Sequence, residues 1–315
     1  MKGEILVIGA SILDVLARPV DEKVFCTGSS PVESVILETG GDALNEATVL
    51  AKLGKKVELL TVLGKDRAGR TIREHCREQG ISLNMAVTEE EVETGINIVL
   101  VKENGERSFL TNPRGTLRAL AMKHIPRKFP EYIKIVSFAS IFVFPEMGDR
   151  EMAETFRRIK SRGILLCADM TKRKNGETVE DIRESLSYVD YLFPNREEAA
   201  LVTGKDYVED MADAFLNYGV KNVVIKCGAE GCFVQNREES FQVPAVPGIS
   251  CVDTTGAGDS FAGGFLCALS EGKSLKECAE FANACGALAV QKMGATAGIS
   301  DRKQVDDLIH STIYG

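Results

Sequence analysis

Short apolar runs recur along the chain, and segments with helical spacing or propensity separate most of them. The apolar runs cover residues 5–8, 57–62, 96–101, 133–138, 164–168, 191–193, 223–227 and 232–234. The segments typical of covering helices are 44–53, 68–79, 150–161, 197–203, 211–218, 260–271, 275–292 and 302–311. This alternation predicts an α/β protein with a mostly parallel, doubly wound sheet and helices on both faces.

Two segments have strand patterns but no helix to cover them. They span about residues 15–39 and 94–113, and the second contains a turn at residues 103–106 between two strand-like runs. Hairpin strands of this kind predict a small sheet that projects from the main body and covers a cleft or pairs with another subunit. The alternative is that these strands extend the edge of the main sheet.

Composition narrows the class of protein. The 315 residues are 44% hydrophobic and 27% charged, which is typical of a globular protein of one large domain or two ordinary ones. A net charge of -8 disfavours nucleic acid and anionic membranes as partners, and the sequence has no transmembrane run. Nine scattered cysteines without a signal peptide predict a reducing cytoplasm. Three histidines leave little material for a histidine-ligated metal or a Ser-His-Asp triad.

Residues 252–261 place a glycine turn, an acidic residue and a helix start within one short segment. Gly256 and Gly258 allow the backbone N–H groups to approach an anion, and the partial positive charge of a helix N-terminus strengthens such a site. A phosphate there would repel Asp259, so its presence is better explained if it takes a proton from an attacking hydroxyl. The alternative is a turn in which Asp259 only caps the helix.

Two other glycine segments follow apolar strands. Residues 64–71 come within one residue of a P-loop but have Arg70 in place of its lysine, so we predict a strand-to-helix turn with Asp66 near the helix start. Residues 9–14 lack the second and third glycines of a dinucleotide fingerprint. Asp14 still lies just past the first strand, where a carboxylate can accept hydrogen bonds from sugar hydroxyls or cap a turn.

Further polar residues follow glycines or strands. Gly40 and Gly41 permit close backbone approach, and Asn45 offers both a donor and an acceptor to a polyol; a hinge with a surface asparagine is the alternative. Asn195 and Glu198 are three residues apart and share one helix face, which suits oxygen ligation of hydrated Mg²⁺. An N-cap with an acidic first turn explains the same pair.

Taken together, these residues resemble the two signatures of the PfkB, or ribokinase-like, family of carbohydrate kinases. The signatures match Gly40-Gly41 with Asn45, and residues 253–261 followed by Gly263-Gly264-Phe265. The match covers nearly the whole chain, and residues 40–48, 167–170 and 188–195 resemble a subgroup of sugar kinases of unknown substrate. The resemblance implies one ribokinase-like α/β domain over residues 1–315, with a β-lid formed by the two helix-free segments.

The resemblance also implies ATP-dependent phosphorylation of a sugar hydroxyl. Asp259 would be the base, and the N–H groups of Gly256, Ala257 and Gly258 would stabilise the charge on the γ-phosphoryl group. The residues that would hold the sugar are Asp14, Gly40, Gly41 and Asn45. Asn195 and Glu198 would act through Mg²⁺ and its waters. The residues along the nucleotide would be Lys226, where some relatives have threonine, with Gly228, Gly231 and Asn283.

Two further features are implied by the resemblance. Many relatives bind a monovalent cation such as K⁺ beside the anion hole, and the matching positions are Asp253, Thr255, Ala289, Lys292, Gly294 and Gly298. The lid of the family often pairs in a homodimer, so we expect the same of this chain.

The departures from the family concern the substrate. Ile12 stands where ribokinases use asparagine, and Val143–Phe144 replaces a polar contact, so ribose is disfavoured. Arg114 follows the second lid segment, and an arginine there can pair with the carboxylate of a sugar acid. Arg107 is better interpreted as a solvated arginine. A neutral ketose or hexose remains open, as do a nucleoside kinase and a sugar- or nucleotide-sensing module without turnover.

Overall fold

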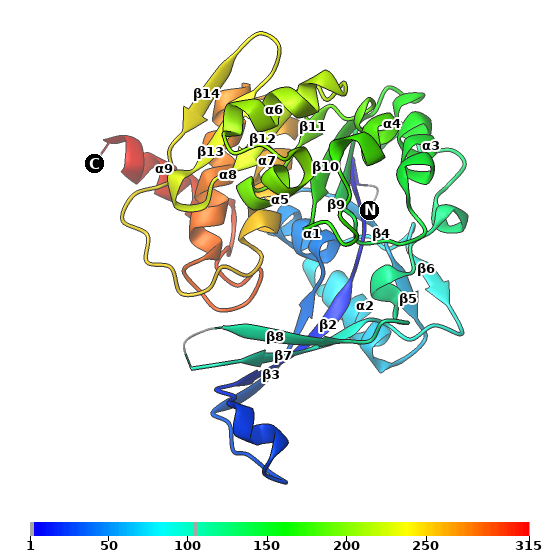
Figure 1. Cartoon of the computed structure of the whole chain (residues 1–315), viewed down its shortest axis with the longest axis vertical. Coiled ribbons are helices and arrows are strands. Elements are labelled where there is room, and N and C mark those ends of the chain that lie inside the picture. Colours follow the sequence, from blue (N-terminus) through cyan, green and yellow to red (C-terminus); the bar gives the residue numbers. More distant parts are fainter. Residues whose placement is uncertain (1–2, 104–105, 315) are drawn as a thin grey trace.

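The computed structural model describes residues 3–103 and 106–314, and within these ranges eight strands form the main sheet (Figure 1). Its order is β14-β13-β12-β11-β10-β9-β1-β4. The strands are β1 Ile5–Ile8, β4 Val57–Leu60, β9 Ile135–Ile141, β10 Leu165–Met170, β11 Tyr191–Leu192, β12 Asn222–Lys226, β13 Cys232–Gln235 and β14 Ser240–Val243. Neighbours from β4 to β12 pair in parallel, whereas β13 and β14 are antiparallel at one edge.

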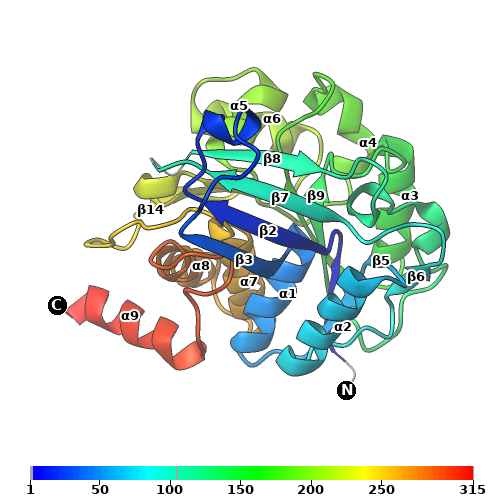
Figure 2. The ribbon, with the colours of Figure 1, turned by 90° about the horizontal axis from the view of Figure 1, so that it is seen from below.

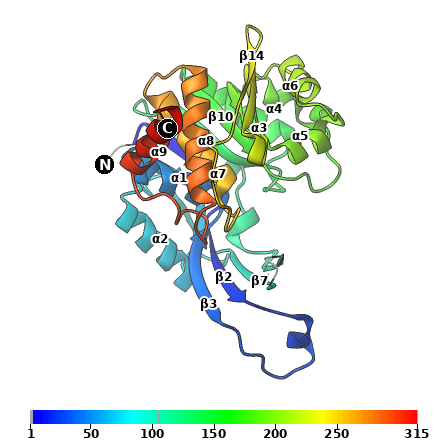
Figure 3. The same ribbon diagram turned by 90° about the vertical axis from the view of Figure 1, so that its left-hand side faces the viewer.

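Helices cover both faces of this sheet (Figure 3). One face carries α1 Asp42–Lys52, α2 Arg67–Gln79, α7 Ala257–Ser270, α8 Leu275–Ala289 and α9 Arg302–Tyr314. The other carries α3 Asp149–Lys160, α4 Arg183–Leu186, α5 Arg196–Thr203 and α6 Val208–Asn217. Ile5 and Val7 of β1 belong to the first core, and Leu6 and Ile8 to the second. Burial on both faces explains why this strand is apolar at every position.

A separate four-stranded sheet projects from the main body, and Figure 2 shows it from below. Its order is β3-β2-β7-β8, with β2 Ile12–Arg18, β3 Ser34–Gly40, β7 Ile96–Val101 and β8 Arg107–Thr111. We call these four strands the lid sheet. It confirms the predicted fold class, and the alternative of an extended main sheet is wrong. Residues 104 and 105 of the predicted turn lie outside the described residues.

Some predicted elements differ from the structure. The apolar run 57–62 is divided between β4 and a short strand, β5 Val62–Gly64, which pairs with β6 Val87–Glu89 in a two-stranded sheet. Thr61 between them is fully buried, so the hydropathy pattern alone did not show the break.

The turn predicted for residues 64–71 is confirmed, because Asp66 caps α2 by accepting the N–H of Gly69 at 2.7 Å. Short 3-10 helices complete the connections at Glu22–Phe25, Thr116–Arg118, Met122–His124, Val179–Ile182 (η4) and Gly228–Glu230 (η5).

Candidate functional site

Glycines fix the position of the first turn of α7. Gly256 is the N-cap of this helix with a φ of 69°, and a Cβ there would lie 2.1 Å from the carbonyl oxygen of Ala295. Farther along α7, a Cβ on Gly263 would lie 2.9 Å from Val49 Cγ1 of α1, and one on Gly264 would lie 2.7 Å from Cys285 Sγ of α8. The backbone of α7 therefore packs directly against both neighbouring helices, an approach that only glycine permits.

This packing brings Asp259 together with Asn45. Asp259 lies in the first turn of α7, and Nδ2 of Asn45 in α1 donates a hydrogen bond to Asp259 Oδ2 at 2.7 Å. Gly256 rather than Asp259 holds the N-cap position of α7, all of whose residues are described, and no side chain caps this helix. The interpretation of Asp259 as a cap is therefore wrong. Two residues that are 214 positions apart in the sequence thus share one hydrogen bond at the predicted anion site.

The N–H groups of the turn are not all equivalent. The N–H of Ala257 donates to the carbonyl oxygen of Thr254 at 3.2 Å. Gly258 lies in the first helical turn, where N–H groups have no partner within the helix. A Cβ on Gly258 would lie 3.4 Å from Lys226 Nζ, so an ammonium group sits beside this residue.

Lys226, at the end of β12, is held by a buried ion pair. Its Nζ lies 2.6 Å from Asp169 Oδ2 of β10, and the two side chains are 13% and 5% exposed. Burial opposes the charge of Lys226, but Asp169 and Glu198 outweigh it and raise the pKa of the ammonium group. Lys226 is therefore a fixed positive charge beside the anion-binding turn.

The carboxylates of the site are shifted toward their protonated forms. Burial and then Asp42 raise the pKa of Asp259 well above its ordinary range, against the hydrogen bond from Asn45. Burial also raises the pKa of Asp42, which accepts a hydrogen bond from Ser140, and raises that of Asp169 to about 7 against the charge of Lys226. Carboxylates with raised pKa values in a polar site are suited to proton transfer.

A polar row crosses the lid sheet near α1. Nδ2 of Asn97 in β7 donates to Asp14 Oδ1 in β2 at 3.0 Å, and Thr111 Oγ1 of β8 donates to Asn97 Oδ1 at 2.9 Å. Asp14 Oδ2 lies over Gly40, where a Cβ would come within 2.2 Å. Gly41 follows as the N-cap of α1 with a φ of 95°. The structure thus gathers Asp14 and both glycines at the start of the helix that carries Asn45.

The residues on which the substrate predictions rest lie in different surroundings. Ile12 is 5% exposed and packs on Gly95, where a Cβ would lie 2.8 Å from Ile12 Cγ2. Arg114 is exposed on the segment after β8, and its backbone N–H donates to Asn112 Oδ1 at 3.0 Å. Arg107 forms an ion pair with Asp253, so its interpretation as a solvated arginine is wrong. Residue spacing could not show this contact, since the partners are far apart in the chain.

The residues predicted along the nucleotide also have structural partners. Asn195 and Glu198 form a capping box at the start of α5, in which each side chain accepts the other's N–H at 2.8 Å. The N-cap interpretation of this pair is therefore confirmed. A Cβ on Gly231 would lie 2.0 Å from Val243 O, and Asn283 Nδ2 donates to the carbonyl oxygens of Val243 and Pro244, each at 3.1 Å. Gly228 has a φ of 59° at the start of η5.

Asp253 ties the turn of α7 to the segment after α8. Its Oδ1 accepts the N–H and Oγ1–H of Thr255 at 2.9 and 2.8 Å, and its Oδ2 accepts the N–H of Gly294 at 3.1 Å. Gly298 packs on the last turn of α8, since a Cβ there would lie 2.1 Å from Leu288 O. Ala289 is buried, whereas the side chain of Lys292 is exposed. The side-chain oxygens of Asp253 are thus already bonded within the protein.

Three carboxylates of this site were not predicted from the sequence. Asp42 directly follows the glycine pair, and Asp169 lies at the carboxyl end of β10, where ligands of parallel sheets collect. That rule would have found Asp169. Glu46 of α1 is fully buried; its Oε2 accepts a hydrogen bond from Ser137 at 2.7 Å, and its Oε1 has no partner among the described residues. No signal in the sequence distinguished Glu46 from an ordinary helix residue.

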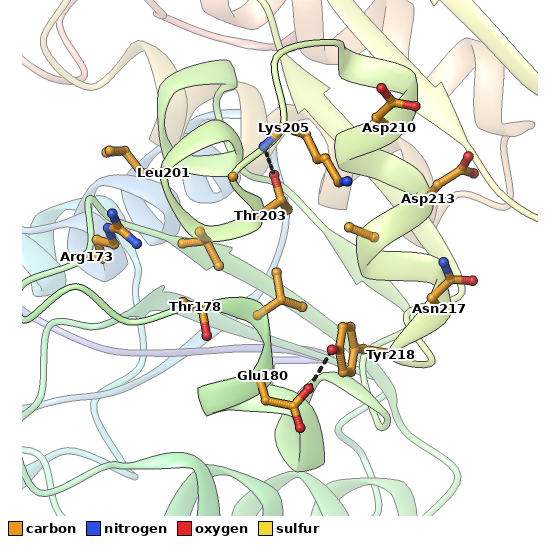
Figure 4. A pocket seen from close by; sticks show the side chains of 14 residues that line it. Arg173, Thr178, Glu180, Leu201, Thr203, Lys205, Asp210, Asp213, Asn217 and Tyr218 are labelled. Atoms are coloured by element: carbon orange, nitrogen blue, oxygen red, sulfur yellow. Dashed lines mark hydrogen bonds between the residues drawn. The ribbon is translucent and has the colours of Figure 1, made fainter.

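Two cavities lie elsewhere. One of about 680 Å³ is bordered by η4, α5 and α6, where the Tyr218 hydroxyl donates to Glu180 at 2.5 Å (Figure 4). The other, of about 460 Å³, is lined by residues of β3, α2 and the segment 294–297. Asp259 lines neither cavity.

Among residues 3–103 and 106–314, no helix is long and apolar enough to cross a membrane, and no three His, Cys, Asp or Glu side chains group as metal ligands.

Known proteins resemble this chain along most of its length. A ribokinase of Haemophilus influenzae is 29% identical over 277 residues, which cover 84% of this chain and 85% of the relative. An Arabidopsis thaliana ribokinase is 30% identical over 289 residues, or 87% of this chain and 73% of that protein. A solved ribokinase structure from Thermotoga maritima superposes with a TM-score of 0.83 at 26% identity and covers 98% of this chain and 100% of its own.

The family model for pfkB carbohydrate kinases matches residues 2–302, a span that contains both signatures and the lid sheet. The chain belongs to the pfkB family of carbohydrate kinases.

Proposed function

We propose that this carbohydrate kinase transfers the γ-phosphoryl group of ATP to a hydroxyl of a sugar or sugar acid, with Asp259 as the general base. Membership of the family establishes the class of reaction. The observation that carries the assignment of the base is the 2.7 Å hydrogen bond between Asn45 and Asp259 beside the Gly256–Gly258 turn. This hydrogen bond holds the Asp259 carboxylate beside the turn that is proposed to bind the γ-phosphoryl group, which supports its role as the base.

In this mechanism Asp259 takes the proton of the attacking hydroxyl as its oxygen forms a bond to the γ-phosphorus. The bond from that phosphorus to the bridging oxygen breaks, and ADP leaves. The N–H groups of Gly256, Ala257 and Gly258 stabilise the charge on the transferred group, and that of Ala257 would divide its hydrogen bond between this group and the carbonyl oxygen of Thr254. Lys226 adds a positive charge beside Gly258, because its ammonium group already lies next to this turn.

The sugar is proposed to lie between α1 and the lid sheet. Asp14 and Asn45 offer an acceptor and a donor to its hydroxyls, and Gly40 and Gly41 allow the backbone to approach it closely. A family relative, the ribokinase of Arabidopsis thaliana, has been solved with ribose and ATP, and its structure superposes with a TM-score of 0.82 at 27% identity. The buried Ile12 argues for a substrate other than ribose here.

The donor set near α5 suits Mg²⁺, which prefers oxygen ligands and keeps several waters. Glu198 offers the carboxylate oxygen that its capping bond leaves over, and Asn195 positions this residue. Bound Mg²⁺ would neutralise the negative charge of the phosphate groups. Removal of Mg²⁺ with a chelator tests whether the reaction requires the ion. The proposed nucleotide residues are Lys226, Gly228, Gly231 and Asn283. Asn283 would act by holding the segment after β14, since its Nδ2 is already bonded there.

A monovalent cation such as K⁺ is proposed beside the same turn. Because the oxygens of Asp253 are bonded within the protein, backbone carbonyl oxygens would supply most of the ligands. The proposed positions are Asp253, Thr255, Ala289, Lys292, Gly294 and Gly298. Omission of K⁺ from the assay tests the site.

We also propose that two copies pair through the outer face of the lid sheet. The register places Val15, Leu37, Ile98 and Leu110 in one row across all four strands. Leu37, Ile98 and Leu110 are 58%, 42% and 52% exposed. An exposed apolar row next to open strand edges is typical of a surface that pairs with another chain.

Asp259→Asn should remove the base and lower kcat by about 10²–10⁴-fold, while the affinity for ATP changes little. The measurement is ADP release with a panel of sugars, sugar acids and nucleosides, together with calorimetric titration of ATP. Asp210→Asn, an exposed position on α6, is the matched control. A near wild-type rate in Asp259→Asn would contradict the mechanism. If no substrate of the panel consumes ATP while ligands still raise the melting temperature, the sensing module becomes the better account.

Arg114→Ala tests the sugar-acid substrate. If Arg114 pairs with a substrate carboxylate, its loss should raise KM for sugar acids about 10-fold or more and leave KM for neutral sugars unchanged. Arg118→Ala removes another exposed arginine nearby and serves as the control. Equal kinetics of the Arg114→Ala and wild-type proteins on every acidic substrate would exclude this role.

Leu37→Glu tests the dimer. A charge in the apolar row should convert the assembly to a monomer, as measured by sedimentation velocity. Tyr207→Glu places the same charge at a 72% exposed position at the start of α6 and should leave the assembly intact. A wild-type protein that sediments as a monomer would refute the proposal.

A further inference from the structure

Arg107 carries a positive charge from the lid sheet to the turn that precedes α7. It is the first residue of β8, and its guanidinium group forms an ion pair with Oδ1 of Asp253. The Arg107 side chain is 21% exposed and that of Asp253 only 4%. A contact buried to this degree is screened less by salt than a surface ion pair. It links two parts of the chain that are 146 residues apart.

Asp253 is part of the framework of the anion-binding turn. Through Thr255 it holds the turn itself, and through the N–H of Gly294 it holds the segment after α8. Gly256 packs on this same segment, at the carbonyl oxygen of Ala295. A displacement of Asp253 would therefore shift the N–H groups that precede Asp259. Through its ion pair, Arg107 connects the lid sheet to this framework.

Arg107 also faces other carboxylates of the lid sheet. Asp14 in β2 and Glu38 in β3 are neighbours across the strand pairing, and a Cβ on Gly294 would lie 2.9 Å from Glu38 Oε2. Burial raises the pKa of both carboxyl groups, and the charge of Arg107 opposes this shift in each. Against the effect of burial, the hydrogen bonds from Thr255 and Gly294 lower the pKa of Asp253, and the charge of Arg107 adds to this shift. Without Arg107, three carboxylates would face one another beside a site for phosphate.

We infer that Arg107 is a positioning residue that joins the lid sheet to the anion-binding turn and serves as the counter-ion of Asp253. This inference rests on the proposed function, because the turn is the proposed site of the γ-phosphoryl group. When the lid sheet lies against the turn, the guanidinium group neutralises a carboxylate that would otherwise repel the phosphate. Turnover is then coupled to the position of the lid sheet, and hence to the sugar bound beneath it.

The test compares Arg107→Gln, Arg107→Lys and the wild-type protein, with Lys102→Gln as the control. Lys102 is a cation of the same hairpin, and its partner Glu106 is exposed to solvent. Arg107→Gln should lower kcat about 10²-fold, the usual cost of displacing catalytic groups by about 1 Å. KM for ATP should change less than about twofold, because the lid sheet carries none of the proposed nucleotide residues. Arg107→Lys should recover part of kcat, since lysine keeps the charge but not the planar fork.

Hydrogen exchange of the ligand-free protein provides a readout that does not depend on activity. Arg107→Gln should speed exchange in residues 107–111 and 253–256 and leave α3 unchanged, whereas Lys102→Gln should change none of these segments. If the wild-type protein phosphorylates no substrate, the proposed function fails, and exchange alone decides whether the contact joins the two segments. Unchanged exchange in Arg107→Gln would overturn the contact. Faster exchange with an unaltered kcat would overturn its coupling to turnover.

Discussion

The close packing of α7 between α1 and α8 is the constraint on which the site depends. Gly263 and Gly264 let the helix backbone lie against Val49 and Cys285, and any Cβ there would collide with them. This approach sets the first turn of α7 beside α1, so Asn45 can reach Asp259. The conformation of Gly256 then turns the chain into the helix over Ala295. The absence of side chains on Gly256, Gly263 and Gly264 thus determines where the proposed base lies.

The site gathers several carboxyl groups, of which that of Asp169 is buried and those of Asp42 and Asp259 are half-buried. Burial raises the pKa values of Asp42, Asp169 and Asp259, and the ammonium group of Lys226 opposes this shift in all three. A carboxyl group whose pKa is raised by folding stabilises the protein most while it is protonated, and this contribution is lost as pH rises through the folded pKa. At neutral pH such groups therefore cost stability. Active sites commonly retain this cost because the chemistry requires the charge.

The sequence predicted the alternation of strands and helices well, because strands buried on both faces are apolar throughout. It also located the lid sheet, since strand patterns without covering helices stood out at both segments. The break after β4 was missed because Thr61 is buried although it is polar. The glycine motifs predicted Gly41, Gly256 and Asp259 as site residues, because a glycine turn is a local feature of the backbone that the sequence shows directly.

Contacts between segments that are far apart in the sequence could not be predicted in the same way. The ion pair of Arg107 with Asp253 joins the lid sheet to the segment before α7, and that of Lys226 with Asp169 joins β12 to β10. Nothing in the spacing of these residues indicates either pair. The capping box of Asn195 and Glu198 was predicted as an alternative because it is local. Local geometry was therefore predictable, whereas the electrostatic network required the fold.

The central claim is that Asp259 acts as a base whose ionisation is set by burial and by Asp42. The most direct test is the pH dependence of kcat for the wild-type and Asp42→Asn proteins on the same substrate. A base must be deprotonated, so kcat should fall as pH is lowered through a pKa above the ordinary aspartate value of about 3.9. Asp42→Asn removes a negative neighbour and should move this acid limb to lower pH. An acid limb in the ordinary aspartate range, or one that Asp42→Asn leaves in place, would contradict the account.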